Sequence, residues 1–515
     1  MMQIIIPMSG IGKRFQDAGY SDPKFMLDIG QKKIIEHVVG MFSGEDKFIF
    51  ICNKDHMEDD KFGIKKLLNN LNLENFEIVA IDPHKLGPVY AVLQAEKYIT
   101  KDMPTIVNYC DFCCDWDYEE FKKFIEQNKC EGCIPAYKGF HPHTLYSNYY
   151  AYLKLNHENV LDDIKEKEPF TSNPREELAS SGTYYFSSGA LVISAFKKCI
   201  KEKLSVNNEY YISLVYKILL QDNLKVLGYE LNHFMQWGTP QDYEEFKYYF
   251  NIFQDKDKKY SGSFDGNYLM SIAGKGQRFR DAGFRNEKPF LDINDTKLFK
   301  LASNDFPSKL PVKIILREDQ EKEAKKYIEQ DEVIVLDGLK NGQALSVYEG
   351  IKNANLNCDK PLHITACDST AIFNKQAYLE LINSEQFDVI VFGAENYPYS
   401  KRSPHSYGWI GVKNQSNIIE KISVKKPIGQ NLSQPIVISD FTFKNADIFN
   451  TAVESMVNRN GKVNNEFYID ECINDCIELG YKVIYFPVDY YVSWGTPEEF
   501  KTFNYWQECF KSWEG

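Results

Sequence analysis

Residues 8–29 of the chain read MSGIGKRFQDAGYSDPKFMLDI, and residues 272–293 read IAGKGQRFRDAGFRNEKPFLDI. Both stretches contain two closely spaced glycines, an arginine, and further on a lysine next to a proline. Each follows a short apolar run that is typical of a buried strand. A glycine-rich turn directly after a strand, met twice in one chain, points to a duplicated α/β domain.

Three further features repeat in the same order and with one common offset. NNEYYI at 207–212 and WGTPQDY at 237–243 return later as NNEFYI and WGTPEEF. Asp111, at the end of an apolar stretch, has its counterpart in Asp368. Order and spacing kept across several segments indicate a tandem duplication.

The duplication predicts two domains. We expect the first domain at 1–253, a polar linker at 254–266 (QDKDKKYSGSFDG) and a second, divergent domain at 267–515. The aromatic-rich end at 503–513 leaves two interpretations open, a homo-oligomer contact or packing on its own domain.

Within the first half, short apolar stretches alternate with stretches of helical spacing. Strands without polar alternation, separated by amphipathic helices, indicate a mainly parallel sheet flanked by helices, here two tandem Rossmann-like domains. Ligands of such sheets bind beyond the carboxyl ends of the strands. The loop at 8–14 and Asp111 should therefore share one edge. The expected strands are 4–7, 47–52, 76–81 and 105–109, and the expected helices 32–42, 64–71 and 88–99.

Composition limits the function classes. The chain has 515 residues, of which 43% are hydrophobic and 26% charged, as in globular proteins. A formal net charge of −13 argues against nucleic acid as a partner, while small phosphates stay compatible. The apolar run at the N-terminus ends at Pro7, so we expect no signal peptide, no membrane partner and a cytoplasmic location.

One cysteine array has the spacing of a zinc site. Cys110, Cys113, Cys130 and Cys133 form a C-x2-C-x16-C-x2-C pattern. The first pair follows one expected strand and the second pair precedes another, which separates the pairs by roughly 15 Å if the strands are parallel. We therefore favour small apolar cysteines over zinc.

The loop after the first expected strand contains Ser9, Gly10, Gly12, Lys13 and Arg14. Glycines let backbone N–H groups approach a phosphate, and a guanidinium clamps its oxygens. A tight turn without a ligand is the plain alternative. The repeat of the arginine and of the later lysine favours phosphate binding.

These motifs resemble the sugar-1-phosphate nucleotidylyltransferases, the NDP-sugar pyrophosphorylases. The strand followed by G-x-G-x-R-F and PKxMLDI is similar to their N-terminal signature, and WGTPQD to their closing block. The resemblance covers both halves of the chain. Other similar segments are HKLGPVYAV at 84–92 (base contact), NYCD at 108–111 (metal), IKEKEP at 164–169 and GTYYF at 182–186 (sugar pocket).

The resemblance implies transfer of a nucleoside monophosphate from an NTP to a small phosphorylated acceptor with release of pyrophosphate, for surface polysaccharide precursors. It implies that Arg14 and the loop amides hold the leaving phosphates, that Lys24 stabilises the α-phosphate, and that Asp111 binds Mg²⁺. Gly87 and Pro88 fall in the nucleotide-binding segment. A surface lysine and a turn-capping aspartate are the plain alternatives for Lys24 and Asp111.

The resemblance also implies an acceptor pocket. Lys167, with Glu166, would receive the acceptor's phosphate and neighbouring groups, and Gly182 would line the pocket. Glu209 would hold a hydroxyl of the acceptor, although a capping charge at a helix start explains it equally well.

The second half keeps the phosphate side and changes the acceptor side. Val424 stands where the first half has Glu166, and Ser439 where it has Gly182. This leaves two hypotheses, a catalyst for a different acceptor, which we favour, or a degenerate copy that scaffolds or senses nucleotide. The nucleotide-binding candidates that are kept are Gly274, Gly276, Arg278, Lys288, Gly342, Asp368 (also the metal candidate) and Lys425.

Two departures and two competing functions remain. Many family members have a second metal-binding aspartate where this chain has Gln236 and Ser493. The aromatic segment at 137–152 suggests a cation cage, hence a cytidylyltransferase for a non-sugar phosphate such as phosphocholine, although packing explains it better. A nucleotide sensor without turnover is the alternative from another class. A glycosyltransferase of related fold would need a D-x-D metal motif. It is disfavoured because the triplet DWD at 115–117 follows the Asp111 loop too closely to replace it.

Overall fold

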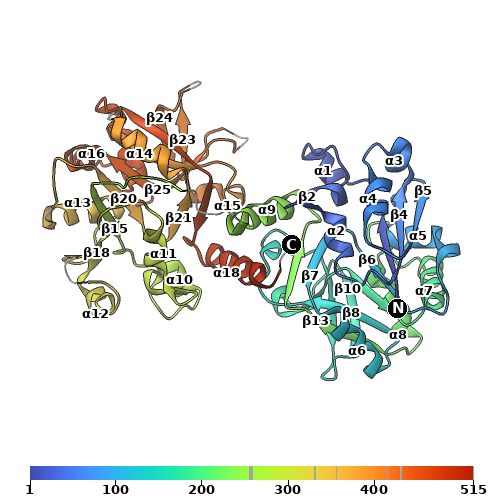
Figure 1. The fold of residues 1–515 in the computed structure, drawn as a ribbon. Coiled ribbons are helices and arrows are strands. Elements are labelled where there is room, and N and C mark those ends of the chain that lie inside the picture. Colours follow the sequence, from blue (N-terminus) through green and yellow to red (C-terminus); the bar gives the residue numbers. More distant parts are fainter. Residues whose placement is uncertain are drawn as a thin grey trace. The chain divides into compact units, whose positions relative to one another are not determined.

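Figure 1 shows the computed structural model of the chain, which describes residues 1–254, 259–329, 332–354, 356–384, 386–413, 416–429 and 432–513. The chain forms two compact units. Unit 1 consists of Met1–Phe253 together with Tyr505–Gly515, and unit 2 consists of Gln254–Asn504.

The end of the chain differs from the expected domain boundary. Residues 505–515, which we expected in the second domain, belong to unit 1. The buried Tyr505 hydroxyl accepts a hydrogen bond from the Phe234 N–H (3.0 Å) and donates one to the Phe234 carbonyl (2.8 Å). Trp506 packs edge-on against Phe246, with ring centroids 5.3 Å apart. The aromatic side chains from Tyr505 onward thus pack within this chain.

The expected linker at 254–266 is only partly a linker. Residues 255–258 lie outside the described residues. Phe264 is buried, pairs with Ser308 in a parallel bridge and contacts the Phe306 ring. Because an aromatic side chain gains free energy from burial, this later part of the segment belongs to the fold of unit 2.

Unit 1 is built on one mixed sheet. Its strand order is β10-β9-β11-β8-β12-β6-β1-β4-β5, with β13 paired to β8. The strands β6, β1, β4 and β5 run parallel, while β12 is antiparallel to both of its neighbours. The bounds are β1 (Gln3–Met8), β4 (Lys47–Asn53), β5 (Asn75–Ile81), β6 (Thr105–Asn108), β8 (Gly132–Tyr137), β9 (Ala151–Leu155), β10 (Leu161–Glu166), β11 (Leu178–Ser180), β12 (Thr183–Phe186) and β13 (Val226–Glu230).

Helices and two small antiparallel pairs complete unit 1. Apolar spacing places the helices as expected, although the stretch 88–99 divides into a helix and a 3-10 turn. The pairs are β2 (Asp28–Ile29) with β3 (Lys32–Lys33), and β7 (Phe112–Asp115) with β14 (His233–Gln236). The helices are α1 (Lys13–Asp17), α2 (Ile34–Val39), α3 (Lys54–Met57), α4 (Ile64–Asn70), α5 (Pro88–Gln94), α6 (Tyr118–Asn128), α7 (Gly189–Lys201), α8 (Ile212–Gln221) and α9 (Pro240–Gln254).

Unit 2 repeats the order of the central strands. Its sheet runs β19-β18-β15-β20-β25-β22-β26, with β23 paired to β24 and β25. The order β22-β25-β20-β15-β18-β19 matches β8-β12-β6-β1-β4-β5 of unit 1, as a duplicated domain predicts. The bounds are β15 (Asn267–Ser271), β18 (Lys313–Arg317), β19 (Val333–Leu336), β20 (Leu362–Ala366), β22 (Val389–Ala394), β23 (Gly408–Val412), β24 (Ile419–Val424), β25 (Ile436–Phe443) and β26 (Val483–Val488).

The remaining elements of unit 2 follow the pattern of unit 1. The small pairs are β16 (Asp292–Ile293) with β17 (Thr296–Lys297), and β21 (Ser369–Ile372) with β27 (Tyr490–Ser493). The helices are α10 (Gln277–Asp281), α11 (Leu298–Asn304), α12 (Glu321–Ala324), α13 (Gln343–Asn353), α14 (Lys375–Ser384), α15 (Pro398–Arg402), α16 (Ala446–Asn458) and α17 (Ile469–Glu478). The last helix, α18 (Pro497–Ser512), begins in unit 2 and belongs to unit 1 from Tyr505 onward.

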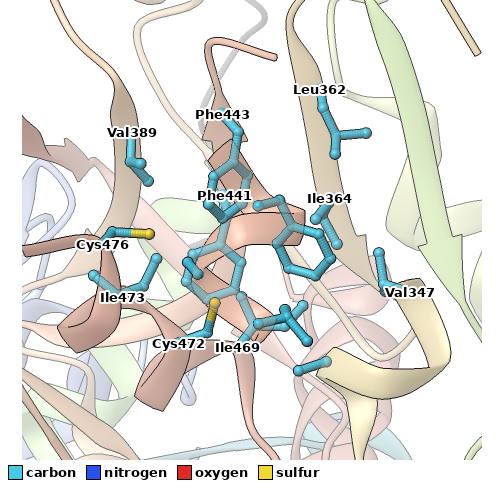
Figure 2. Close-up of a cluster of buried hydrophobic side chains, with 14 of the residues drawn as sticks. Val347, Leu362, Ile364, Val389, Phe441, Phe443, Ile469, Cys472, Ile473 and Cys476 are labelled. Carbon is cyan, nitrogen blue, oxygen red and sulfur yellow. The ribbon is translucent and has the colours of Figure 1, made fainter. Parts of the chain in front are cut away.

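The core of unit 2 lies between its sheet and α17 (Figure 2). Phe441 and Phe443 of β25 are fully buried and lie beside side chains of α17. Complete burial of each such side chain contributes about 1.5–3 kcal/mol. Two cysteines of α17, Cys472 and Cys476, are also in this core, where they act as small apolar residues.

Across the described ranges, no helix combines the length and the apolar character needed to cross a membrane.

Candidate functional site

The glycine loop joins β1 to α1 at the carboxyl end of β1. Gly12 begins α1 with φ 69°, a left-handed conformation that glycine adopts without strain. A side chain at Gly10 would meet no atom within 4 Å, so the loop backbone is open to a ligand there. Ser9 is buried at the start of the loop and Arg14 is exposed.

Asp111 lies at the same sheet edge as this loop, because β6 is parallel to β1 and ends just before it. The Lys24 ammonium, in the 3-10 turn Lys24–Met26, lies 2.5 Å from the Asp111 carboxylate. Burial works to lower the pKa of Lys24, but the Asp111 carboxylate outweighs it and raises that pKa. The charge of Arg14 also reaches Lys24. The structure thus brings these predicted residues together.

The closing WGTP segment folds onto Asp111. The Trp237 N–H donates to the Asp111 carbonyl at 2.9 Å, and Trp237 itself is buried in the core. A Cβ on Gly238 would lie 2.9 Å from an Asp111 carboxylate oxygen and 3.3 Å from the Gln236 amide nitrogen. Gln236 therefore stands beside Asp111, and glycine at 238 keeps the space between them clear.

The predicted acceptor residues form a second group. The Lys167 ammonium donates to the Tyr211 hydroxyl at 2.5 Å, and that hydroxyl donates to the Glu209 carboxylate. The Ser213 hydroxyl donates to Glu166 at 2.6 Å. Burial raises the pKa of Glu166, and Ser213 and Lys167 oppose this shift. Glu166, Lys167 and Glu209 therefore belong to one neighbourhood at the end of β10 and the start of α8.

Tyr211 and Ser213 were missed by the reasoning from sequence. Tyr211 lies 4.3 Å below the Lys167 ammonium, measured to the ring centroid, and the charge of Arg14 reaches its hydroxyl. The repeated segment at 207–212 contained Tyr211, so repetition was a signal for it. Ser213 lies outside that segment and differs between the halves, and no sequence signal marked it.

At two glycines of the predicted site, the backbone of another segment comes very close. Gly87 has φ 85°, and a Cβ there would lie 2.8 Å from the Tyr210 backbone nitrogen and oxygen. Gly87 and Pro88 thus join the start of α5 to the turn that carries Glu209. Gly182 has φ 100°, and its carbonyl accepts from Tyr109 N–H at 3.1 Å.

Lys13 is placed differently from the other loop residues. Its ammonium pairs with Asp17 of the same short helix at 3.1 Å, and its side chain is 75% exposed. Among the residues that the structure describes, Asp17 is its ion-pair partner. This exposed pair is worth at most about 1 kcal/mol, so a phosphate can readily break it.

Unit 2 repeats the phosphate side of this geometry. Lys288 forms an ion pair with Asp368 and donates to the Gly495 carbonyl at 3.2 Å. The Trp494 N–H donates to the Asp368 carbonyl at 2.7 Å, as Trp237 does to Asp111. Gly276 begins α10 with φ 60°, like Gly12.

A metal at these sites would rest on few protein ligands. Within the part of the chain that the structure describes, no three His, Cys, Asp or Glu side chains come together as a ligand set. Of the four cysteines with zinc-site spacing, which we expected to be small apolar residues, Cys130 lies beside Cys133, whereas Cys110 lies beside Lys24. One aspartate per unit suits Mg²⁺ when phosphate oxygens and water complete its shell.

Comparison with known proteins gives one family match. A family model described as nucleotidyl transferase matches residues 3–248. A curated relative, the "Bifunctional protein GlmU" of Methanocaldococcus jannaschii, is 26% identical over 242 residues, which are 47% of this chain and 52% of the relative. The chain thus spans about half the length of the curated relative it matches.

Two solved structures are each similar to about half of this chain. The nucleoside-diphosphate-sugar pyrophosphorylase from Vibrio cholerae RC9 is 20% identical with a TM-score of 0.40, over 47% of this chain and 97% of that one. The inositol-1-phosphate CTP transferase from T. maritima is 16% identical with a TM-score of 0.38, over 47% and 91%.

Proposed function

Because a nucleotidyl transferase family model matches residues 3–248, we propose that unit 1 transfers a nucleoside monophosphate from an NTP to a small phosphomonoester and releases pyrophosphate. The observation that carries this proposal is the 2.5 Å ion pair of Lys24 and Asp111 at the sheet edge that also holds the glycine loop. Cation, carboxylate and open backbone at one edge suit a nucleotide phosphate chain.

The reaction needs positioning more than proton transfer. An oxygen of the acceptor's phosphate bonds to the α-phosphorus, and the bond from that phosphorus to the oxygen bridging to the β-phosphate breaks. Pyrophosphate leaves with that bonding pair. The attacking oxygen is already ionised, because the second pKa of a phosphomonoester is about 6. The protein holds two anions together and stabilises the added charge.

The described residues supply these functions on the nucleotide side. Arg14 and the amides of Gly10 and Gly12 bind the leaving phosphates, and Lys24 stabilises the charge that grows on the α-phosphate. Asp111 would hold Mg²⁺, which when bound neutralises phosphate charge. The Lys24 ammonium compensates the Asp111 carboxylate, so an arriving nucleotide meets a lysine that is already in place.

On the acceptor side, Lys167 binds the phosphate of the acceptor, and Glu166 and Glu209 accept hydrogen bonds from its neighbouring groups. We propose a sugar phosphate as the acceptor and precursor synthesis for surface polysaccharide as the role, in the cytoplasm. The aromatic segment does not favour the phosphocholine alternative, because Tyr137, His141 and His143 are buried against one another.

The test is pyrophosphate release with Mg²⁺, using ATP, CTP, GTP and UTP against a panel of sugar, polyol and amino-alcohol phosphates. We expect one combination of NTP and phosphomonoester to support pyrophosphate release. For that combination Asp111→Asn should lower kcat by about 100-fold or more. Asp102→Asn, an exposed aspartate of the same unit, is the matched control and should leave the rate unchanged. NTP binding without release from any pair would favour the nucleotide sensor instead.

A further inference from the structure

Unit 2 has the same glycine loop, lysine and aspartate as unit 1, although the family match ends at residue 248. A Cβ on Gly276 would lie 3.3 Å from the Lys288 Cβ, so the glycine loop of unit 2 lies directly over the lysine that pairs with Asp368. The charges of Arg278 and Asp368 both reach Lys425. The groups that bind phosphates are therefore gathered in unit 2 as they are in unit 1.

The acceptor side of unit 2 has lost one carboxylate and gained another. Val424 ends β24 where Glu166 ends β10. Ser213 is the second residue of α8, and the second residue of α17 is Asp470. The hydrogen-bonded pair of a strand glutamate and a helix serine is thus exchanged for a strand valine and a helix aspartate.

A third position changes with them. In unit 1 the partner of Glu166 in the sheet is Ala151, and in unit 2 the partner of Val424 is Gly408. A Cβ on Gly408 would lie 2.5 Å from a carboxylate oxygen of Asp470, which is closer than real Cβ contacts come. In this position the carboxylate occupies space that a side chain at residue 408 would fill.

The new carboxylate is half-buried, beside the retained lysine. Burial raises the pKa of Asp470 to about 6, and the Lys425 charge opposes this rise. Burial lowers the pKa of Lys425, against the charge of Asp470. Lys425 has φ 59°, close to the 61° of Lys167, so the two lysines leave their strands with the same backbone turn.

The helix that carries Asp470 is firmly held. Ile469, Cys472 and Ile473 of α17 pack in the core beside Phe441 (Figure 2). Acidic residues in the first turn also suit the helix dipole. Asp470 is therefore presented from a fixed element, as a binding group requires.

We propose that unit 2 is a second nucleotidylyl-transfer site, whose acceptor pocket is built on Lys425 and Asp470 and takes a phosphomonoester different from that of unit 1. The proposal rests on the function proposed for unit 1. The preferred acceptor of unit 2 presents an apolar edge to Val424 and a hydroxyl or ammonium hydrogen to Asp470. Bond making and breaking are the same as in unit 1, and pyrophosphate leaves.

The full chain allows the two sites to be separated. Asp111→Asn silences unit 1 and Asp368→Asn silences unit 2, with pyrophosphate release measured for each NTP and phosphomonoester. We expect one pair to survive Asp111→Asn and to be lost in Asp368→Asn. For that pair Asp470→Asn should raise the acceptor KM about tenfold or more, the effect of one hydrogen bond to a charged group. Asp447→Asn, an exposed carboxylate in the first turn of α16, is the matched control.

A gain-of-function variant complements these losses. The triple variant G408A/V424E/D470S restores the unit 1 arrangement in unit 2 and should shift its acceptor preference toward the substrate of unit 1. Loss of all release in Asp111→Asn, with Asp368→Asn fully active, would overturn the second site and leave the function of unit 1 standing. Loss of all release in Asp368→Asn alone would instead overturn the assignment of unit 1.

Discussion

Lys425 and Asp470 show how one residue pair records the divergence of the two units. The lysine is retained from the first half, but its carboxylate partner now comes from a helix instead of a strand. In unit 1 the same neighbourhood contains Glu166 hydrogen-bonded to Ser213. Both proposed pockets have a carboxylate near the lysine, but it comes from a strand in unit 1 and from a helix in unit 2. We therefore expect the two pockets to recognise different acceptor groups.

The raised pKa of Asp470 makes the stability of unit 2 depend on pH. The carboxyl loses its proton near pH 4 in the unfolded chain and near pH 6 in the folded protein. Between these values the folded state binds more protons, so stability falls as pH rises through this window. The free energy of unfolding falls by about 3 kcal/mol at most across this window. Urea unfolding at pH 4.5 and pH 7 should show Asp470→Asn gaining stability relative to the wild type at the higher pH. An equal difference at both pH values would contradict this prediction.

At the scale of elements, α5 and α8 of unit 1 are joined through their preceding turns. The Tyr210 N–H donates to the Leu86 carbonyl at 2.9 Å, and the Val89 N–H donates to the Tyr210 carbonyl at 3.2 Å. The start of α5 carries the predicted nucleotide contact, and the turn before α8 carries Glu209 and Tyr211. One backbone junction thus joins the segments that we propose to bind the nucleotide and the acceptor.

Gly87→Ala tests this junction. The new Cβ would lie 2.8 Å from backbone atoms of Tyr210, at a φ of 85° that only glycine adopts without strain. Gly63→Ala is the matched control, because Gly63 also has a positive φ but no atom lies within 4 Å of its Cβ position. Urea unfolding should show Gly87→Ala to be the more destabilising by about 2 kcal/mol, since it adds a clash to the strain. Equal losses would show that the junction can relax.

For the whole molecule, the division into units does not follow the repeat along the chain. Residues from Tyr505 onward belong to unit 1, although the repeat places them at the end of the second half. Unit 1 therefore depends on both ends of the chain. The buried hydroxyl of Tyr505 contributes to this dependence because it satisfies two backbone groups of Phe234.

Tyr505→Phe should destabilise unit 1 by about 1–3 kcal/mol, because it leaves the buried N–H and carbonyl of Phe234 without their hydroxyl partner. The measurement is urea unfolding followed by the pyrophosphate release of unit 1. Tyr149→Phe, at a side chain that is 73% exposed, is the control and should change little. A loss no larger than that of the control would mean that unit 1 does not rely on this contact.

The sequence by itself determined the elements, their repeat and the phosphate side of both candidate sites. Strand and helix periodicity, the turn glycines, and the spacing of Arg14, Lys24 and Asp111 are local patterns, and a duplicated chain displays each of them twice. The strand order that the two units share agrees with this reading. The roles assigned to these residues stay predictions until the variants are measured.

Only the tertiary structure decided which distant residues complete each acceptor pocket and where the chain's end packs. Glu166 with Ser213, Gly408 with Asp470, and Phe234 with Tyr505 are each far apart in sequence. Side chains at such separations meet only when strands and helices pack, and no local periodicity encodes that meeting. In the sequence, the difference between Ser213 and Asp470 indicates no function. In the fold, it places a carboxylate beside Lys425.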